Sequence, residues 1–206
     1  MHYQTLAAPA TAELTIKKSR FIGHASPVCT ADEALLFCKQ IAQKHPGANH
    51  NVWAFSLRQG RLQRFNDDGE PKGTAGMPTL DVLTKQEIVD AAVVVTRYFG
   101  GILLGAGGLV RAYSQAAKAA VNAAGIATMA MCALVQLRFD YTLYGRMGAV
   151  ISAAGGTVLA ADFGPQVTLE VRARIEHAPQ LIAAVTDACN GRCTCEIVRE
   201  EFAAVM

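Results

Sequence analysis

The sequence predicts an α+β protein that consists of two domains. Its first part reads as ββαββ, a long loop and then αβα, and its second part reads as βαββαβ. Charge is also divided unequally, because residues 1–127 hold 13 Lys and Arg against 9 Asp and Glu, whereas residues 128–206 hold 6 against 8. We therefore expect a first domain over residues 1–126 and a second domain over residues 127–206.

The composition is typical of a compact protein with reduced thiols. Of the 206 residues, 51% are hydrophobic and 17% are charged, and the net charge is +2. No apolar run approaches the roughly twenty residues that a membrane span needs, and the N-terminus lacks the features of a secretory signal. Six cysteines are sparse for a disulfide framework in a chain of this length. We expect a cytoplasmic protein without a membrane partner.

Periodicity and turn residues place the elements of the first domain. In chain order these are strands over residues 13–16 and 21–28, a helix ending near 44, strands over 52–57 and 62–65, a helix over 79–87, a strand from residue 90 and a helix over 111–124. Thr30 is the expected N-cap of the first helix, with Glu33 as its capping-box partner. The candidates for its buried stripe are Leu35, Leu36, Cys38 and Ile41.

The second domain has the pattern of a ferredoxin-like unit. Its expected elements are a strand over 128–139, a helix over 143–154, strands over 157–161 and 167–175, a helix over 178–188 and a strand over 193–199. Cys193 and Cys195 would share one face of the last strand. Their spacing to Cys189 does not match a zinc site, so buried free thiols are expected.

A glycine-rich segment joins the central strand of the first domain to its last helix. Its glycines are Gly100, Gly101, Gly105, Gly107 and Gly108. Glycines let backbone amides approach a ligand closely, and residues 91–139 contain Arg97 and Arg111 but no Asp or Glu. These features predict an anion-binding surface at a helix N-terminus, which Tyr98 adjoins. Tight strand-to-helix packing that needs small residues is the alternative.

This segment does not match the known nucleotide-binding loops. No Gly-Lys-Ser/Thr follows the glycines, and Val110 stands where the dinucleotide fingerprint requires glycine. No serine, cysteine or histidine occurs in the context of a catalytic nucleophile. The sequence therefore predicts no cofactor and no catalytic residue.

Residues 66–76 (NDDGEPKGTAG) predict an exposed loop. Its carboxylates could hold Mg²⁺ through oxygen ligands, but Lys72 would repel a cation, so a metal is not expected. The loop is instead a candidate for contact with a partner. The residues concerned are Asp67, Asp68, Glu70, Lys72 and Thr74.

Basic residues on turns and strand ends extend the candidate interface. Lys17, Lys18 and Arg20 form a basic cluster between the first two expected strands. They belong to the same domain as the segment around the glycines that contains no Asp or Glu. These basic residues form either a solvent-exposed face without a partner or a positively charged surface that binds RNA. His50 is a further candidate, although no cysteine or carboxylate lies at metal-ligand spacing to it.

Four motifs resemble the IMPACT family. They are KKSRFI (17–22), KHPGANHNVWAF (44–55), DDGEPKGTAGMPTLDVL (67–83) and VVVTRYFGGILLGAGGLVRAYSQAA (93–117), and the two long ones are specific. The resemblance, to the compact bacterial branch, implies a ribosomal-protein S5 domain 2-like fold for the first domain. It implies that the second domain is similar to domain V of elongation factor G. Eukaryotic relatives restrain a translation-control kinase by competing for its activator.

These observations together predict a translation-associated binding protein without enzymatic activity. RNA, the ribosome or a protein partner in translation control would contact the basic, glycine-rich face of the first domain. One alternative is a metal-assisted enzyme that acts on a phosphorylated or carboxylated small molecule. Another is a protein-interaction module that uses an apolar face of the second domain.

Overall fold

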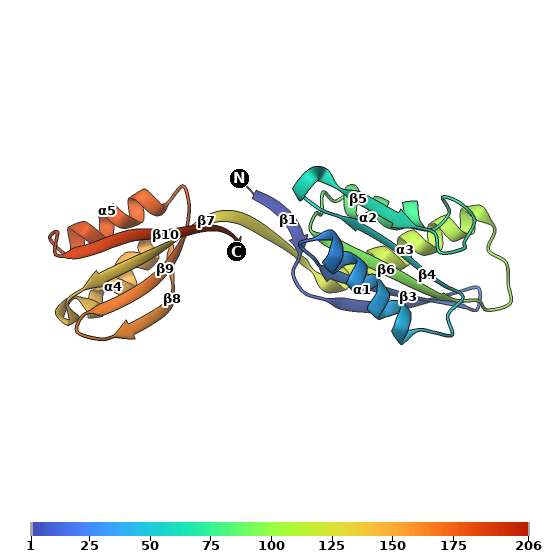
Figure 1. Cartoon of the computed structure of the whole chain (residues 1–206), viewed down its shortest axis with the longest axis horizontal. Coiled ribbons are helices and arrows are strands. Elements are labelled where there is room, and N and C mark those ends of the chain that lie inside the picture. Colours follow the sequence, from blue (N-terminus) through green and yellow to red (C-terminus); the bar gives the residue numbers. More distant parts are fainter. Residues whose placement is uncertain (1, 206) are drawn as a thin grey trace. The chain divides into compact units, whose positions relative to one another are not determined.

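The structure, a computed structural model, describes residues 2–205, which form two compact units (Figure 1). One unit comprises Tyr3–Thr128, and the other begins at Met129 and takes in His2. Each unit encloses a hydrophobic core of its own. Among these residues, no helix combines the length and the apolar character that crossing a membrane requires.

A five-stranded antiparallel sheet forms the centre of the first unit. Its strands follow the order β2-β3-β6-β4-β5. They are β2 (Ala10–Ile16), β3 (Ser19–Pro27), β4 (His50–Ser56), β5 (Gln63–Asn66) and β6 (Ala91–Tyr98). Because β6 lies in the middle and is covered on both faces, all its residues except Tyr98 are buried.

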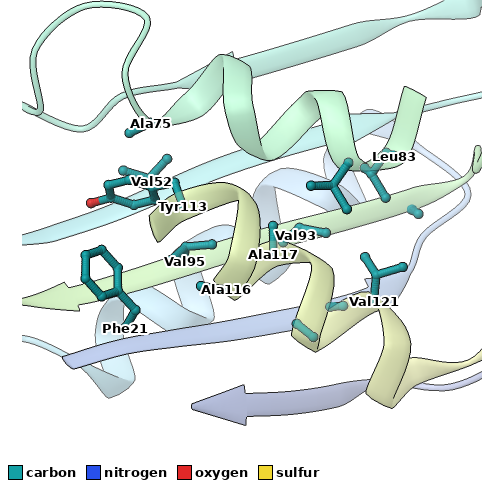
Figure 2. Packing of buried hydrophobic residues seen from close by; sticks show 14 of the residues in the cluster. Phe21, Val52, Ala75, Leu83, Val93, Val95, Tyr113, Ala116, Ala117 and Val121 are labelled. Atoms are coloured by element: carbon teal, nitrogen blue, oxygen red, sulfur yellow. The ribbon is translucent and has the colours of Figure 1, made fainter. Parts of the chain in front are cut away.

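Helices cover both faces of this sheet. They are α1 (Ala31–Lys44), α2 (Gly76–Thr84) and α3 (Ala106–Ala124). Successive side chains of a strand point to opposite faces. Val93 and Val95 of β6 therefore share a core with Leu83 of α2 and with α3 (Figure 2), whereas Val94 contributes to a core beneath α1.

Alanine brings α3 close to the sheet. The side of this helix that faces the strands carries Ala112, Ala116, Ala117 and Ala120, all buried. Opposite them, β3 places Gly23, where a Cβ atom would overlap the carbonyl of Ala116. This close approach fixes the position of α3 relative to β3.

The second unit is an antiparallel sheet with two helices. Its elements are β7 (Ile126–Phe139), α4 (Tyr141–Ala153), β8 (Gly156–Phe163), β9 (Val167–Arg174), α5 (Ala178–Ala188) and β10 (Cys193–Val205). Four of the strands follow the order β10-β7-β9-β8, and β1 (His2–Leu6) also pairs with β7. The buried residues of α4 and α5 belong to one core with alternate residues of β7 and β9, so both helices lie on the same face of the sheet.

Several local predictions are confirmed. Thr30 Oγ1 accepts a hydrogen bond from Glu33 N at 3.2 Å. The Glu33 carboxylate also contributes to the cap of this helix. It accepts a hydrogen bond from Cys29 N (2.7 Å) rather than from the backbone amide of the N-cap residue. Cys193 and Cys195 are half-buried free thiols with their Sγ atoms 3.8 Å apart.

Other predictions are wrong in detail. Leu35 and Leu36 are exposed, because the buried stripe of α1 runs through Ala34, Cys38 and Ile41 at intervals of three and four residues. The helix expected from residue 111 begins at Ala106, so two glycines lie in its first turn despite their low helix propensity. Strand β1 was not predicted, and β10 continues beyond residue 199.

Candidate nucleic-acid interface

The glycine turn, defined as residues 99–108, is exposed between β6 and α3. Gly101 and Gly105 adopt positive φ angles of 83° and 73°, and no atom outside the turn approaches the position of a Cβ on either residue or on Gly107. Gly105 is the N-cap of α3 and provides no side-chain cap. The first amides of a helix lack intrahelical partners, so the amides at this end point outward with no acidic residue in the first turn.

A tight lysine turn packs against the glycine turn. Lys17 and Lys18 have φ angles of 46° and 65° and connect β2 to β3 by a two-residue hairpin. A Cβ on Gly100 would overlap the Lys18 carbonyl, and Gly100 N donates to Ser19 Oγ at 3.1 Å. The expected alternative, close packing that needs glycine, therefore applies to Gly100. The contact between Gly100 and Lys18 also places the lysine turn beside the glycine turn.

Arg111 and Arg20 differ in their partners. Arg111 is exposed on the second turn of α3, and its Nε donates to the Gly107 carbonyl at 3.2 Å. Neither Arg111 nor the two lysines form an ion pair within residues 2–205. Arg20 binds the Glu13 carboxylate through Nε (2.6 Å) and Nη2 (2.8 Å) and lies over the Tyr98 ring. Its charge is therefore largely neutralised.

Arg97 does not lie on the anion-facing surface where we expected it. Its side chain is buried, and Nη1 donates to Glu70 Oε1 at 2.5 Å. Tyr113 Oη donates to the same oxygen at 2.8 Å, and burial, followed by the charge of Glu70, raises the pKa of the Tyr113 hydroxyl. Sequence reasoning missed this pairing because Glu70 is 27 residues away in a loop that was expected to be solvated.

The acidic loop binds its own backbone. Asp67 accepts hydrogen bonds from the amides of Gly73 (2.9 Å), Ala75 (3.1 Å) and Gly76 (2.8 Å). Burial alone would raise the pKa of Asp67, but these three amides together lower it. Thr74 Oγ1 donates to the Pro71 carbonyl, whereas Lys72 is exposed.

The remaining carboxylate of the loop is engaged as well. Asp68 Oδ2 accepts from Asn51 N at 2.6 Å. His50 bridges two residues of the loop, with Nδ1 2.7 Å from the Asp68 carbonyl oxygen and Nε2 3.8 Å from Glu70 Oε1. In the described part of the chain, no three His, Cys, Asp or Glu side chains form a group that could hold a metal ion.

Apolar side chains project from the glycine turn, and the sequence reasoning missed Ile102 and Leu103 among them. Phe99 and Ile102 are partly exposed, and Leu103 is 82% exposed. The signal was available, because apolar residues between glycines in an exposed loop have no core to enter. Exposed aromatic rings can stack on bases.

Comparison with known proteins adds the family. Residues 17–121 match the family described as "Impact N-terminal domain", and residues 137–192 match "Domain of unknown function (DUF1949)". The chain belongs to the IMPACT family. "IMPACT family member YvyE" of Bacillus subtilis is 36% identical over 92% of this chain and 88% of its own length.

More distant IMPACT relatives match a smaller part of the chain. "Protein IMPACT" of Mus musculus is 33% identical, but the match covers 45% of this chain and 30% of the mouse protein. A solved structure described as "an hypothetical protein" is 30% identical and covers 97% of this chain and 98% of its own, with a TM-score of 0.62. The comparison supports a mixed α and β fold with two domains and antiparallel sheets.

Proposed function

We propose that this IMPACT family member is a translation-associated protein that binds RNA or the ribosome through the glycine turn. The observation that carries the proposal is the exposed N-terminus of α3, which bears Arg111 on its second turn and follows a glycine turn packed against the turn of Lys17 and Lys18. None of these three cations forms an ion pair within residues 2–205. The combination suits a phosphodiester backbone, because amides and cations contact phosphate oxygens without reading sequence.

The two arginines then have different roles. Arg111 contacts phosphate, whereas Arg97 holds the acidic loop against β6 through Glu70 and so supports the surface from within. Phe99 and Leu103 project beside the amides, where they can contact bases. The acidic loop is a secondary contact region, in which Lys72 is the exposed cation.

The architecture supports the link to translation. We assign the second unit to the ferredoxin-like βαββαβ fold, and its order β10-β7-β9-β8 with two helices on one face supports this assignment. We assign the first unit to the ribosomal-protein S5 domain 2-like fold on the resemblance of its motifs. The control of translation by eukaryotic IMPACT proteins is consistent with a partner in the same process.

Ribosome co-sedimentation and RNA binding by the full chain test the proposal. Arg111→Ala should weaken RNA binding about three- to tenfold and reduce the slope of log affinity against log salt by about 0.7 to 1, since one phosphate contact is lost. Lys39→Ala is the matched control, because Lys39 is an exposed cation on α1 at the other face of the sheet. If the full chain binds neither RNA nor ribosomes at low salt, the proposal is wrong.

A further inference from the structure

The second unit contains a basic cavity that the proposed function does not use. Its volume is about 380 Å³, and its lining includes Cys132, Thr157, Arg172, Arg174 and His177. Register brings these groups together, because Arg174 of β9 pairs with Cys132 of β7 and Arg172 pairs with Thr157 of β8. Both arginines occupy the face of β9 opposite to the one that packs on the helices.

Arg172 lacks a counter-ion. It is half-buried and forms no ion pair within residues 2–205. A guanidinium that loses hydration without a carboxylate partner favours a bound anion, and its planar donors match the oxygens of a phosphate or carboxylate group. The cavity thus offers an unsatisfied positive charge.

Glu176 approaches the other two groups without reaching them. Its Oε1 lies 3.7 Å from Arg174 Nη1 and 3.9 Å from His177 Nε2, which is too far for hydrogen bonds. The two donors therefore converge on one carboxylate position and keep their hydrogen-bonding capacity. Gly155 makes room for the ring, since a Cβ at this residue would lie 3.1 Å from His177 Nδ1.

The floor of the cavity is neutral. Burial raises the pKa of the Cys132 thiol, the charges of Arg172 and Arg174 oppose that shift, and the charge of Glu201 adds to it. The thiol stays protonated near neutral pH, so it provides no nucleophile. Ala204 and Val205 add apolar surface. These features favour binding of a ligand rather than a reaction with it.

We infer that this cavity binds a small phosphorylated molecule, with its phosphate on Arg172, Arg174 and His177 and its organic part on the apolar lining. Three cationic or hydrogen-bonding groups suit a dianionic phosphate better than a single carboxylate. A volume of about 380 Å³ exceeds that of phosphate alone and falls in the range of small-molecule sites. The inference goes beyond the proposed RNA interface, which lies in the first unit.

Titration of the full-length ¹⁵N-labelled chain with inorganic phosphate, ribose 5-phosphate and acetate tests this inference. Ribose 5-phosphate should shift the amide signals of Thr157, Arg172 and His177 with saturation, and it should bind more tightly than phosphate or acetate. Arg172→Ala should weaken this binding about tenfold or more, as expected for loss of a charge-assisted hydrogen bond. Glu176→Gln should strengthen it about two- to fivefold, because a competing charge is removed.

Arg138→Ala is the matched control, because Arg138 is exposed on β7, donates to Gln136 Oε1 at 2.6 Å and does not line the cavity. It should leave the affinity for ribose 5-phosphate unchanged. A gain of affinity in Glu176→Gln cannot arise from poor folding, so this variant keeps the inference testable if Arg172→Ala is unstable. Absence of saturable binding, equal loss in both arginine variants, or shifts produced by RNA alone would each overturn it. None of these outcomes bears on RNA binding by the glycine turn.

Discussion

The first unit presents two glycine-rich loops that differ in what their backbone amides bind. In the acidic loop, residues 66–76, Asp67 accepts from three amides of its own segment. In the glycine turn, residues 99–108, no carboxylate is present and the N-cap glycine offers no side chain to the helix amides. The comparison teaches that glycine content alone does not make an anion site. A loop can bind an external anion only where the chain leaves its amides without an internal acceptor.

The same difference separates the two arginines of this region. Arg97 faces the acidic loop and is neutralised by Glu70 in the interior. Arg111 faces the glycine turn, and its Nε donates a hydrogen bond to the Gly107 carbonyl. Three substitutions test this comparison, and Glu70→Ala should have the largest effect.

Glu70→Ala removes the internal acceptor from Arg97 and Tyr113. A buried guanidinium without a carboxylate is strongly unfavourable, so the free energy of unfolding of the first unit should fall by about 3 to 5 kcal/mol. Urea unfolding followed by the fluorescence of Trp53, the single tryptophan, reports on this unit. Lys72→Ala, an exposed change in the same loop, serves as the control and should have little effect. Equal stabilities of the two variants would show that the buried ion pair of Arg97 and Glu70 does not stabilise the acidic loop.

Asp67→Ala exposes the amides of the acidic loop. We expect a loss of about 2 kcal/mol near neutral pH, because hydrogen bonds to an ionised group are removed. The pKa of Asp67 is lowered in the folded chain, so this contribution is present above its ordinary value of 3.8 and is lost as the pH falls through the lower folded value. Urea titrations of both proteins across the acidic range measure it. A difference in stability that persists at the lowest pH would contradict the assignment.

Gly107→Ala tests whether the glycine turn must stay open. A Cβ meets no atom at this helical position, so stability should remain the same or rise by up to about 1 kcal/mol. RNA affinity should nevertheless fall about fivefold, since the methyl group hinders approach to the amides. Gly145→Ala, at an equally open position in α4, should give the same gain in stability without a loss of affinity. Unchanged RNA binding by Gly107→Ala would indicate that the amides are not the contact.

Secondary structure was predictable wherever local rules decide it. The β-branched run of β6 and the Thr30 cap are examples, because neither depends on distant residues. The sequence left open whether the glycine turn is exposed or packed, and the structure shows exposure at Gly101 and Gly105 and close packing at Gly100. The exposure of Leu35 and Leu36 was not predictable, because hydrophobicity indicates a buried face only when the packing partner of the helix is known.

The two-part α+β organisation, the family, and the absence of acidic residues from the segment around the glycine turn all follow from the order of the amino acids. Which charges remain for a ligand depends on the folded arrangement. Arg97 meets Glu70, and Arg172 meets no carboxylate within residues 2–205, because of pairings between residues far apart in the chain. Electrostatic interactions depend on distance in space and on burial, and neither can be read from spacing along the chain.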